Sequence, residues 1–263
     1  MRLGTQDKDF FPKGLTEKFI HVKRLGFDCF EIDGKVLTED TTLVKEAIMA
    51  SGLPVVSACG GYRGWIGDFI EERRQNAIVD LKLIIRALRE VGGKSVVVPA
   101  AWGMFTYRLP PMVSPRSQEG DRKAILDSLK ELDPVARECG ITICLEPLNR
   151  YQDHMLNTLK DAADVIEAGG FEAVKITADF YHMAIEEDSV AGSLEKYSRE
   201  IGHVHIAENH RFQPGTGSMD FKSLMGTLKK IGYDGAVVYE CRVRGEDQEK
   251  AYRESVEHMR RFI

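Results

Sequence analysis

Hydrophobic residues gather in eight short runs along the chain, each about the length of one β-strand. The runs are rich in Val, Ile or aromatic residues, a composition typical of strands. We expect strands at residues 1–6, 28–33, 53–59, 95–100, 142–147, 174–179, 203–208 and 236–241. Most runs follow a glycine that is suited to end a helix, namely Gly26, Gly52, Gly93, Gly140, Gly170, Gly202 and Gly235.

Amphipathic stretches separate these runs and predict helices. Residues 72–92 and 246–263 are the clearest, and the first places Ile78, Leu81, Ile84, Ile85 and Leu88 on one face. Because strand and helix alternate without a Pro-, Gly- or Ser-rich linker, we expect an α/β fold, a single (β/α)8 TIM barrel over residues 1–263. An open doubly wound sheet is the alternative. It would favour a glycine fingerprint after the first strand, and GTQDKD is not one.

Composition and charge narrow the class of protein. The 263 residues are 43% hydrophobic, enough for a large core, and the net charge of −5 with no basic block predicts no nucleic-acid partner. No apolar run approaches membrane-spanning length and no leader pattern opens the chain, so we expect no membrane association. Five scattered cysteines indicate free thiols in a reducing compartment, which predicts a cytoplasmic protein.

Polar side chains mark the last four predicted strands. Glu146 ends the fifth and a proline follows it; Asp179 ends the sixth, His205 lies in the seventh, and Glu240 ends the eighth. The carboxyl ends of barrel strands point into the active-site mouth. We therefore expect these four side chains to meet at one rim of the barrel.

Three acids and one imidazole in one place indicate a metal site. Any one of them alone is explained as a helix cap or an arginine partner. Together they need a cation, because burying several carboxylates side by side is costly without one. The oxygen-rich set suits Mn²⁺, with Co²⁺ or Mg²⁺ as alternatives, better than tetrahedral Zn²⁺.

Several segments resemble a known superfamily. LEPLNRY, ADFYHM, HVHIAENHRFQPGTG and GYDGAVVYE are similar to the corresponding segments of the sugar isomerases and epimerases with a xylose-isomerase-like barrel. Within it the chain most resembles the ketose 3-epimerases that act on D-tagatose and D-psicose. The likeness follows the strand order of the whole chain and is strongest over residues 141–241.

The resemblance implies roles for particular residues. The family's metal ligands match Glu146, Asp179, His205 and Glu240, and its pair of acid–base carboxylates matches Glu146 and Glu240. Its substrate-binding histidine and arginine match His182 and Arg211. Where the epimerases carry a substrate-contacting glutamate, this chain has Gln152, which exchanges hydrogen bonds but cannot take a proton. The family also commonly forms dimers or tetramers, so we expect a homodimer or homotetramer.

The chemistry of such a site explains an epimerase. A metal that holds a carbonyl and an adjacent hydroxyl stabilises the cis-enediolate formed when the proton α to a ketone is lost. Glu146 and Glu240, on strands five and eight, are expected on opposite faces of the substrate. Removal on one face and return on the other inverts the carbon, here C3 of a free ketose. Return to the neighbouring carbon is aldose–ketose isomerisation.

Other motifs have simpler interpretations. The loop 100–118 is long and carries Trp102, Phe105 and Tyr107, so it either covers a substrate or meets a partner subunit. PGTGSMD lacks a P-loop lysine and predicts a turn with Asp220 capping the next helix. The acidic run 186–188 predicts a solvated helix start rather than a second metal site.

Three rival functions stay open. One is an aldose–ketose, inosose or hydroxypyruvate-type isomerase, a dehydratase or another sugar-acid enzyme on the same site, which Gln152 favours. A second is a zinc nuclease like endonuclease IV, but the early strands offer at most Glu31, Asp33 and Cys59 as further ligands and the chain is acidic. The third is a non-catalytic sugar-binding or scaffold protein, which the retention of four ligands and two bases disfavours.

Overall fold

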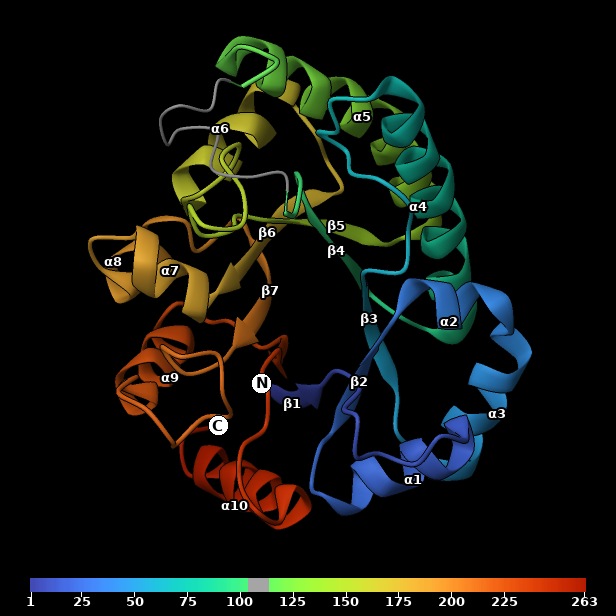
Figure 1. Ribbon diagram of the computed structural model, residues 1–263, viewed down its shortest axis with the longest axis vertical. Coiled ribbons are helices and arrows are strands. Elements are labelled where there is room, and N and C mark those ends of the chain that lie inside the picture. Colours follow the sequence, from blue (N-terminus) through green and yellow to red (C-terminus); the bar gives the residue numbers. More distant parts are fainter. Residues whose placement is uncertain (104–113) are drawn as a thin grey trace.

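Eight parallel strands close into a barrel in the computed structural model, which describes residues 1–103 and 114–263 (Figure 1). Every expected run overlaps one strand, although the seventh strand begins two residues before its run, and the TIM-barrel prediction is confirmed. The strands are β1 Arg2–Thr5, β2 Cys29–Ile32, β3 Val55–Cys59, β4 Ser95–Pro99, β5 Thr142–Glu146, β6 Val174–Asp179, β7 Ile201–Ile206 and β8 Ala236–Tyr239.

Helices lie around the outside of this barrel (Figure 1). In the described part of the chain they are α1 Leu15–Arg24, α2 Gly34–Glu39, α3 Thr41–Ser51, α4 Glu71–Val91, α5 Gln118–Cys139, α6 Leu159–Gly169, α7 Phe180–Glu186, α8 Val190–Lys196, α9 Phe221–Lys230 and α10 Gln248–Arg260. The two clearest sequence predictions correspond to α4 and α10. None of these helices combines the length and the apolar character that crossing a membrane demands.

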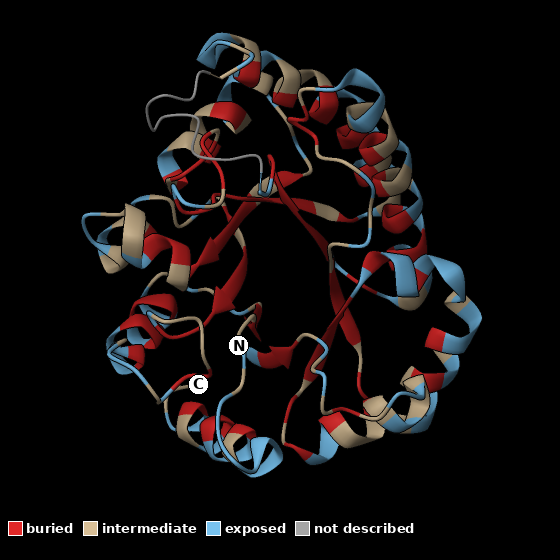
Figure 2. Cartoon of the chain, viewed as in Figure 1, coloured by how far each residue is buried: buried red, intermediate tan, exposed pale blue. Residues whose placement is uncertain are grey.

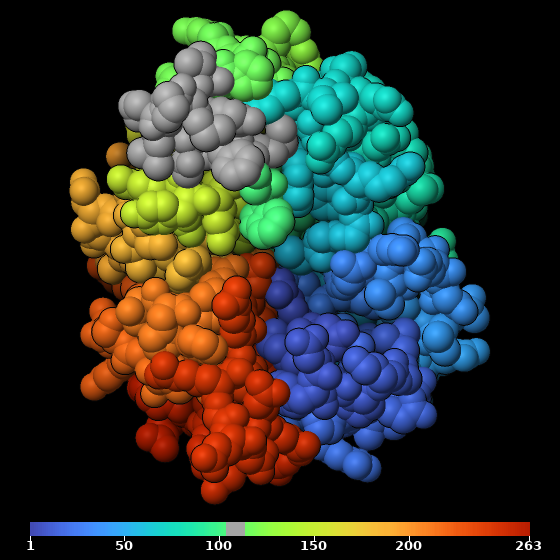
Figure 3. All heavy atoms as spheres, viewed as in Figure 1, coloured from blue at the N-terminus to red at the C-terminus, as the bar shows by residue number. Residues whose placement is uncertain are grey.

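The first and last strands complete the barrel. β1 pairs with β8 in parallel register, with Leu3 opposite Val237 and Thr5 opposite Tyr239. The two ends of the chain are thereby brought together, and Figure 3 shows the blue N-terminal and red C-terminal parts side by side. Closure leaves no strand edge exposed, and the carboxyl ends of all strands reach the same rim.

The strands are buried on both sides, whereas the helices are buried only on the face toward the barrel (Figure 2). On α4, Ile78, Leu81 and Leu88 are buried as the periodicity predicts, while Val79 and Leu83 on the opposite face are exposed. Aliphatic packing between strands and helices therefore forms a rigid wall around the rim. Hydrophobic burial of this kind provides the main driving force for folding.

Three of the expected helix-ending glycines cap their helices in the left-handed conformation: Gly52, Gly140 and Gly170, with φ of 62–64°. Three assignments are wrong. α4 ends at Gly92 rather than Gly93, Gly235 directly precedes β8, well after α9 has ended at Lys230, and Gly202 lies inside β7. Gly202 is needed there for space, because a Cβ would lie 2.8 Å from the Lys175 Cβ.

Candidate active site

Four polar side chains converge at the carboxyl rim of the barrel. Glu146 ends β5, Asp179 ends β6, His205 lies near the end of β7, and Glu240 directly follows β8. One ligand atom from each lies within 4.8 Å of the others. The structure thus brings together the four residues that the sequence singled out.

Direct contacts tie this cluster together. His205 Nδ1 lies 2.9 Å from both Glu146 Oε1 and Glu240 Oε2. Arg211 places one guanidinium nitrogen 2.7 Å from Asp179 Oδ2 and the other 2.6 Å from Glu240 Oε2. Asp179 also caps α7, with its other oxygen accepting the Tyr181 backbone N–H at 2.7 Å. Each acid is therefore held in one orientation.

The two glutamates have opposite electrostatic environments. Burial and the neighbouring charge of Glu240 raise the pKa of Glu146 to about 7. Burial also favours the neutral form of Glu240, but the charges of Arg211 and His205 outweigh it and hold the pKa of Glu240 well below its ordinary value. Two carboxyl groups with separated pKa values suit the roles of acid and base.

The donor set fits a divalent cation. Its three carboxylates and one imidazole nitrogen converge on a single point, and all four side chains are buried or nearly so. Glu240 Oε2 is buried and makes no hydrogen bond of normal geometry within the described residues. Oxygen-rich sites with one histidine suit Mn²⁺ or Mg²⁺, as expected from the sequence, and nothing in the geometry selects one metal.

Glu31 was underrated by the sequence analysis. It lies in β2 with its side chain buried, and its Oε1 is 2.8 Å from His205 Nε2. Its Oε2 is 2.9 Å from His203 Nε2. Two features of the sequence indicate this role. His203 and His205 are two residues apart on one strand and so share a face, and Glu31 lies one residue before the end of an early strand.

A cavity of about 350 Å³ opens beside the cluster. Glu146 and Glu240 contribute to its wall, together with residues from several βα loops. Its other lining residues include Gln6, Cys59, Tyr62, Trp65, Trp102, Leu148, Gln152, His182, Arg211 and Arg242. The volume is in the range of small-molecule sites.

His182 faces this cavity as a neutral donor. Its Nδ1 accepts the backbone N–H of Asn149 at 3.0 Å and lies 2.8 Å from the Asn149 side-chain nitrogen. The proton is therefore assigned to Nε2, which lies 3.7 Å from Asp179 Oδ2. Burial lowers the pKa of His182, which keeps the ring uncharged near neutral pH.

The remaining predicted substrate contacts also line the cavity. The backbone carbonyl of Gln152 accepts the Gly103 backbone N–H at 3.0 Å. The side-chain amide of Gln152 takes no part in this bond. Trp102 is 56% exposed at the cavity edge. Phe105 and Tyr107, the other aromatic residues of that loop, lie outside the described residues.

Two minor sequence predictions have different outcomes. Asp220 caps α9 by accepting the Ser223 backbone N–H at 3.0 Å, as expected. The acidic run 186–188 does not start a helix: Glu186 ends α7 and pairs with Arg150 at 2.9 Å. The next helix, α8, begins only after Ser189, which caps it.

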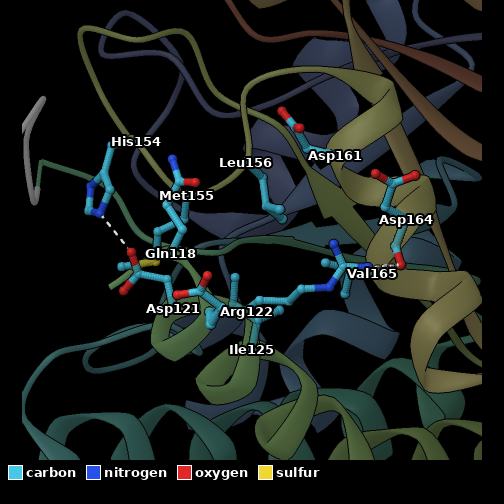
Figure 4. Close-up of a pocket in the computed structure, with 11 residues that line it drawn as sticks. Gln118, Asp121, Arg122, Ile125, His154, Met155, Leu156, Asp161, Asp164 and Val165 are labelled. Carbon is cyan, nitrogen blue, oxygen red and sulfur yellow. Dashed lines mark hydrogen bonds and ion pairs between the residues drawn. The ribbon is translucent and has the colours of Figure 1, made fainter. Parts of the chain in front are cut away.

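A second cavity, of about 300 Å³, lies between α5, α6 and the loop before α6 (Figure 4). Its most prominent polar contact is a buried pair, His154 Nε2 and Asp121 Oδ2, 3.0 Å apart. Arg116 binds the other oxygen of Asp121 at 2.7 Å. Because His154 and Arg116 each bind one oxygen of Asp121, the pair forms a structural link between the loop and α5.

The fold and this cluster define a family. The family described as xylose isomerase-like TIM barrel matches residues 19–262. The chain belongs to this family.

Individual relatives narrow the assignment further. The chain is 56% identical over 260 residues to a 3-dehydro-D-guloside 4-epimerase of Escherichia coli, with 99% of each chain covered. The crystal structure of an E. coli 3-keto-D-glucoside 4-epimerase superposes with a TM-score of 0.98 at 56% identity, again over 99% of both chains. A D-psicose 3-epimerase of Ruminiclostridium cellulolyticum is 36% identical over 48% of this chain and 43% of its own. The expectation of an isomerase-class carbohydrate epimerase is confirmed.

Proposed function

We propose that this protein is a metal-dependent epimerase that inverts C4 of a 3-keto-glycoside. The observation that supports this most strongly is 56% identity, over 99% of both chains, to a 3-dehydro-D-guloside 4-epimerase. The predicted acid–base pair at the rim supplies the chemistry that such a reaction needs. This substrate differs from the free ketose inferred from the sequence, but the reacting carbon is again next to a ketone.

Glu146, Asp179, His205 and Glu240 would hold the cation. When bound, a divalent ion polarises the substrate carbonyl and so makes the proton on the adjacent carbon more acidic. Mn²⁺ remains our first choice, with Co²⁺ or Mg²⁺ as alternatives.

Glu146 and Glu240 exchange the proton. They approach the centre from β5 and from the end of β8, separated around the rim by β6 and β7. One carboxylate removes the C4 proton on one face, and the other carboxyl group delivers a proton to the opposite face. The surroundings of the two groups differ, since the pKa of Glu146 is raised and that of Glu240 is lowered, and this asymmetry supports separate roles as acid and base.

Uncharged donors at the cavity wall orient the sugar. His182 presents its Nε2–H, and the Gln152 amide offers both a donor and an acceptor. The Tyr62 hydroxyl is buried and has no hydrogen-bond partner within the described part of the chain. Burial raises the pKa of Tyr62 well above its ordinary value, so it stays a neutral donor. Arg211 contributes by fixing Asp179 and Glu240, and Trp102 offers an apolar face at the cavity edge.

A free-ketose 3-epimerase is the second candidate. Several 3-epimerases match about half of this chain at 30–40% identity, and the reaction has the same acid–base chemistry. Gln152, in place of the glutamate of those enzymes, is the residue that argues against it. The homo-oligomer and the cytoplasmic location are further parts of this proposal.

Product analysis by NMR tests the choice. Mn²⁺-loaded protein is incubated separately with a methyl 3-keto-glucoside and with fructose, psicose and tagatose. We expect the C4 epimer of the glycoside and no turnover of the free ketoses. Rapid formation of a C3 epimer from a free ketose, with the glycoside unchanged, would overturn the proposal in favour of the second candidate.

A further inference from the structure

Glu31 is a buried carboxylate that the proton exchange described above does not use. Its oxygens meet four polar groups, which come from the end of β1, from β3 and from β7. Oε1 accepts the Gln6 Nε2–H at 2.9 Å and lies 2.8 Å from His205 Nε2. Oε2 accepts the Ser57 hydroxyl at 2.6 Å and lies 2.9 Å from His203 Nε2.

A carboxylate suits this environment better than an amide. The Gln6 amide and the Ser57 hydroxyl donate to Glu31, His205 Nε2 faces its Oε1 at 2.8 Å, and His203 Nε2 lies 2.9 Å from its Oε2. An ionised carboxylate accepts on both oxygens, whereas the NH₂ of a glutamine would face donors on one side. Leaving such buried groups unpaired is costly.

The contact with Glu31 decides which nitrogen of His205 faces the cluster. Nε2 points at Glu31 Oε1, so Nδ1 is the nitrogen left to face Glu146 and Glu240, 2.9 Å away. In metal sites, a carboxylate on the far nitrogen of a histidine fixes both its tautomer and its ring orientation.

We infer that Glu31 is a positioning residue, which holds the Nε2–H of His205 so that Nδ1 is available to the divalent cation. This inference rests on the metal site of the proposed function. His203 and Ser57 act one step further out by holding Glu31 itself. Gln6 lines the substrate cavity and also donates to Glu31, so the support of the metal ligand extends to the cavity wall.

A competing arrangement uses Glu31 as a ligand. Glu31, His203 and His205 also bring ligand atoms within 4.8 Å of one another. A cation there would have to take His205 through Nε2 and displace two close contacts of Glu31. The two arrangements therefore differ in which nitrogen of His205 carries the metal.

Metal affinity is the first test. Mn²⁺ binding to the full chain is measured by competition with a chelator for wild type, Glu31→Gln and the control Asp133→Asn. Asp133 is also a buried, hydrogen-bonded carboxylate, but it lies on α5 and binds backbone N–H groups of residues 172 and 173. We expect Glu31→Gln to weaken Mn²⁺ binding about 10–100-fold, and Asp133→Asn to leave it unchanged.

The state of His205 is the second test, and a merely structural role of Glu31 would not change it. Protein with ¹⁵N-labelled histidine is loaded with Zn²⁺ as a diamagnetic probe, and His205→Asn identifies the signals of this ring. We expect a metal-bound Nδ1 and a slowly exchanging Nε2–H in wild type, with that N–H lost or shifted in Glu31→Gln.

The outcomes separate the inference from the function on which it rests. Wild-type Mn²⁺ affinity in Glu31→Gln, or a metal-bound Nε2 in wild type, would overturn the inference alone. Failure of wild type to bind any divalent cation would overturn the metal site of the proposed function as well. Circular dichroism on each variant confirms that a loss of binding is not a loss of fold.

Discussion

At the residue scale, the proposed mechanism depends on two carboxyl groups, Glu146 and Glu240, whose surroundings differ although their chemistry is the same. Glu146 has no arginine within ion-pairing distance among the described residues, whereas Glu240 contacts both Arg211 and His205. This asymmetry raises the pKa of Glu146 and lowers the pKa of Glu240 relative to their ordinary values. Neither contact is visible in the sequence, because Arg211 reaches the cluster only through the loop after β7.

Removing either acid should stop proton exchange. Glu146→Gln and Glu240→Gln are each expected to lower kcat by about 10²–10⁴-fold or more, because the amide neither takes nor gives a proton. Initial rates of C4 epimer formation provide the measurement. Glu187→Gln, at a helix junction away from the cavity, is the matched control and should keep its turnover. Near-normal rates in either cluster variant would refute their assigned roles.

The Tyr62 hydroxyl should contribute to substrate binding. Tyr62→Phe removes one neutral hydrogen-bond donor, so we expect KM to rise about 3–10-fold with a smaller change in kcat. Tyr233→Phe is the control, since the Tyr233 hydroxyl already donates to the Ala236 carbonyl at 2.6 Å. That control should lose stability and retain its KM. An unchanged KM in Tyr62→Phe would show that the hydroxyl does not contact the sugar.

At the element scale, the loops at the rim carry buried polar groups that affect stability. Asp153, in the loop after β5, is fully buried, and burial raises its pKa to about 6. Its Oδ2 accepts the Leu156 backbone N–H at 3.3 Å, while Oδ1 has no hydrogen-bond partner within residues 1–103 and 114–263.

Asp153 should make the protein less stable as pH rises. Its pKa in the folded state lies above the ordinary value of 3.8, so its stabilising effect is present below about pH 4 and is lost as pH rises through about 6. The free energy of unfolding of Asp153→Asn should therefore rise relative to that of wild type between pH 4 and 7. The expected rise is about 2–3 kcal/mol, since one pKa unit is about 1.4 kcal/mol. Urea unfolding at several pH values measures this. A difference between the two proteins that does not vary with pH would contradict the assignment.

Replacing Gly202 and Gly226 by alanine should have opposite effects on the free energy of unfolding. Gly202→Ala brings a Cβ to 3.0 Å from the Cys144 sulfur as well as against Lys175, and we expect a loss of about 1–3 kcal/mol. Gly226 is inside α9 with open space around it, so Gly226→Ala should gain about 0.5–1 kcal/mol. Chemical denaturation of both variants compares them. Equal effects would mean that steric contact in the sheet is not what selects Gly202.

The sequence predicted where the strands and helices lie, but it predicted their first and last residues less accurately. Alternating apolar runs and helical periodicity located every strand, because barrel strands are buried on both faces and read as short continuous runs. Gly202 was mistaken for a helix end because a glycine before an apolar run carries the same pattern in both settings. The run 186–188 was misplaced because its acids pair with Arg150 and neighbouring backbone instead of capping a helix.

At the scale of the whole molecule, the barrel explains why the site could be found from sequence at all. Closure brings the carboxyl ends of consecutive strands to one rim, so residues far apart in the chain become neighbours by topology alone. That logic predicted that Glu146, Asp179, His205 and Glu240 would lie close together, and the structure places them within 4.8 Å of one another. It did not recover Glu31, since its importance comes from contacts across the barrel interior to His203 and His205.

Substrate identity depends on features that topology does not determine. The cavity wall combines Gln6 from the end of β1 with Tyr62 and Trp65, Trp102 and Gln152 from three different loops. We propose that these residues decide between a free ketose and a keto-glycoside. The resemblance of the sequence to the ketose 3-epimerases favours a free ketose. The similarity to a 4-epimerase over 99% of the chain supports a keto-glycoside.

Deuterium tracing tests the central claim, proton exchange by two opposed acids, most directly. Mn²⁺-loaded protein converts a methyl 3-keto-glucoside in D₂O, and NMR follows the C4 position of the product and of the remaining substrate. Our account predicts deuterium at C4 in the first product formed, while unreacted substrate keeps its C4 proton. Product that retains the original proton, or deuterium appearing in the substrate as fast as in the product, would contradict it.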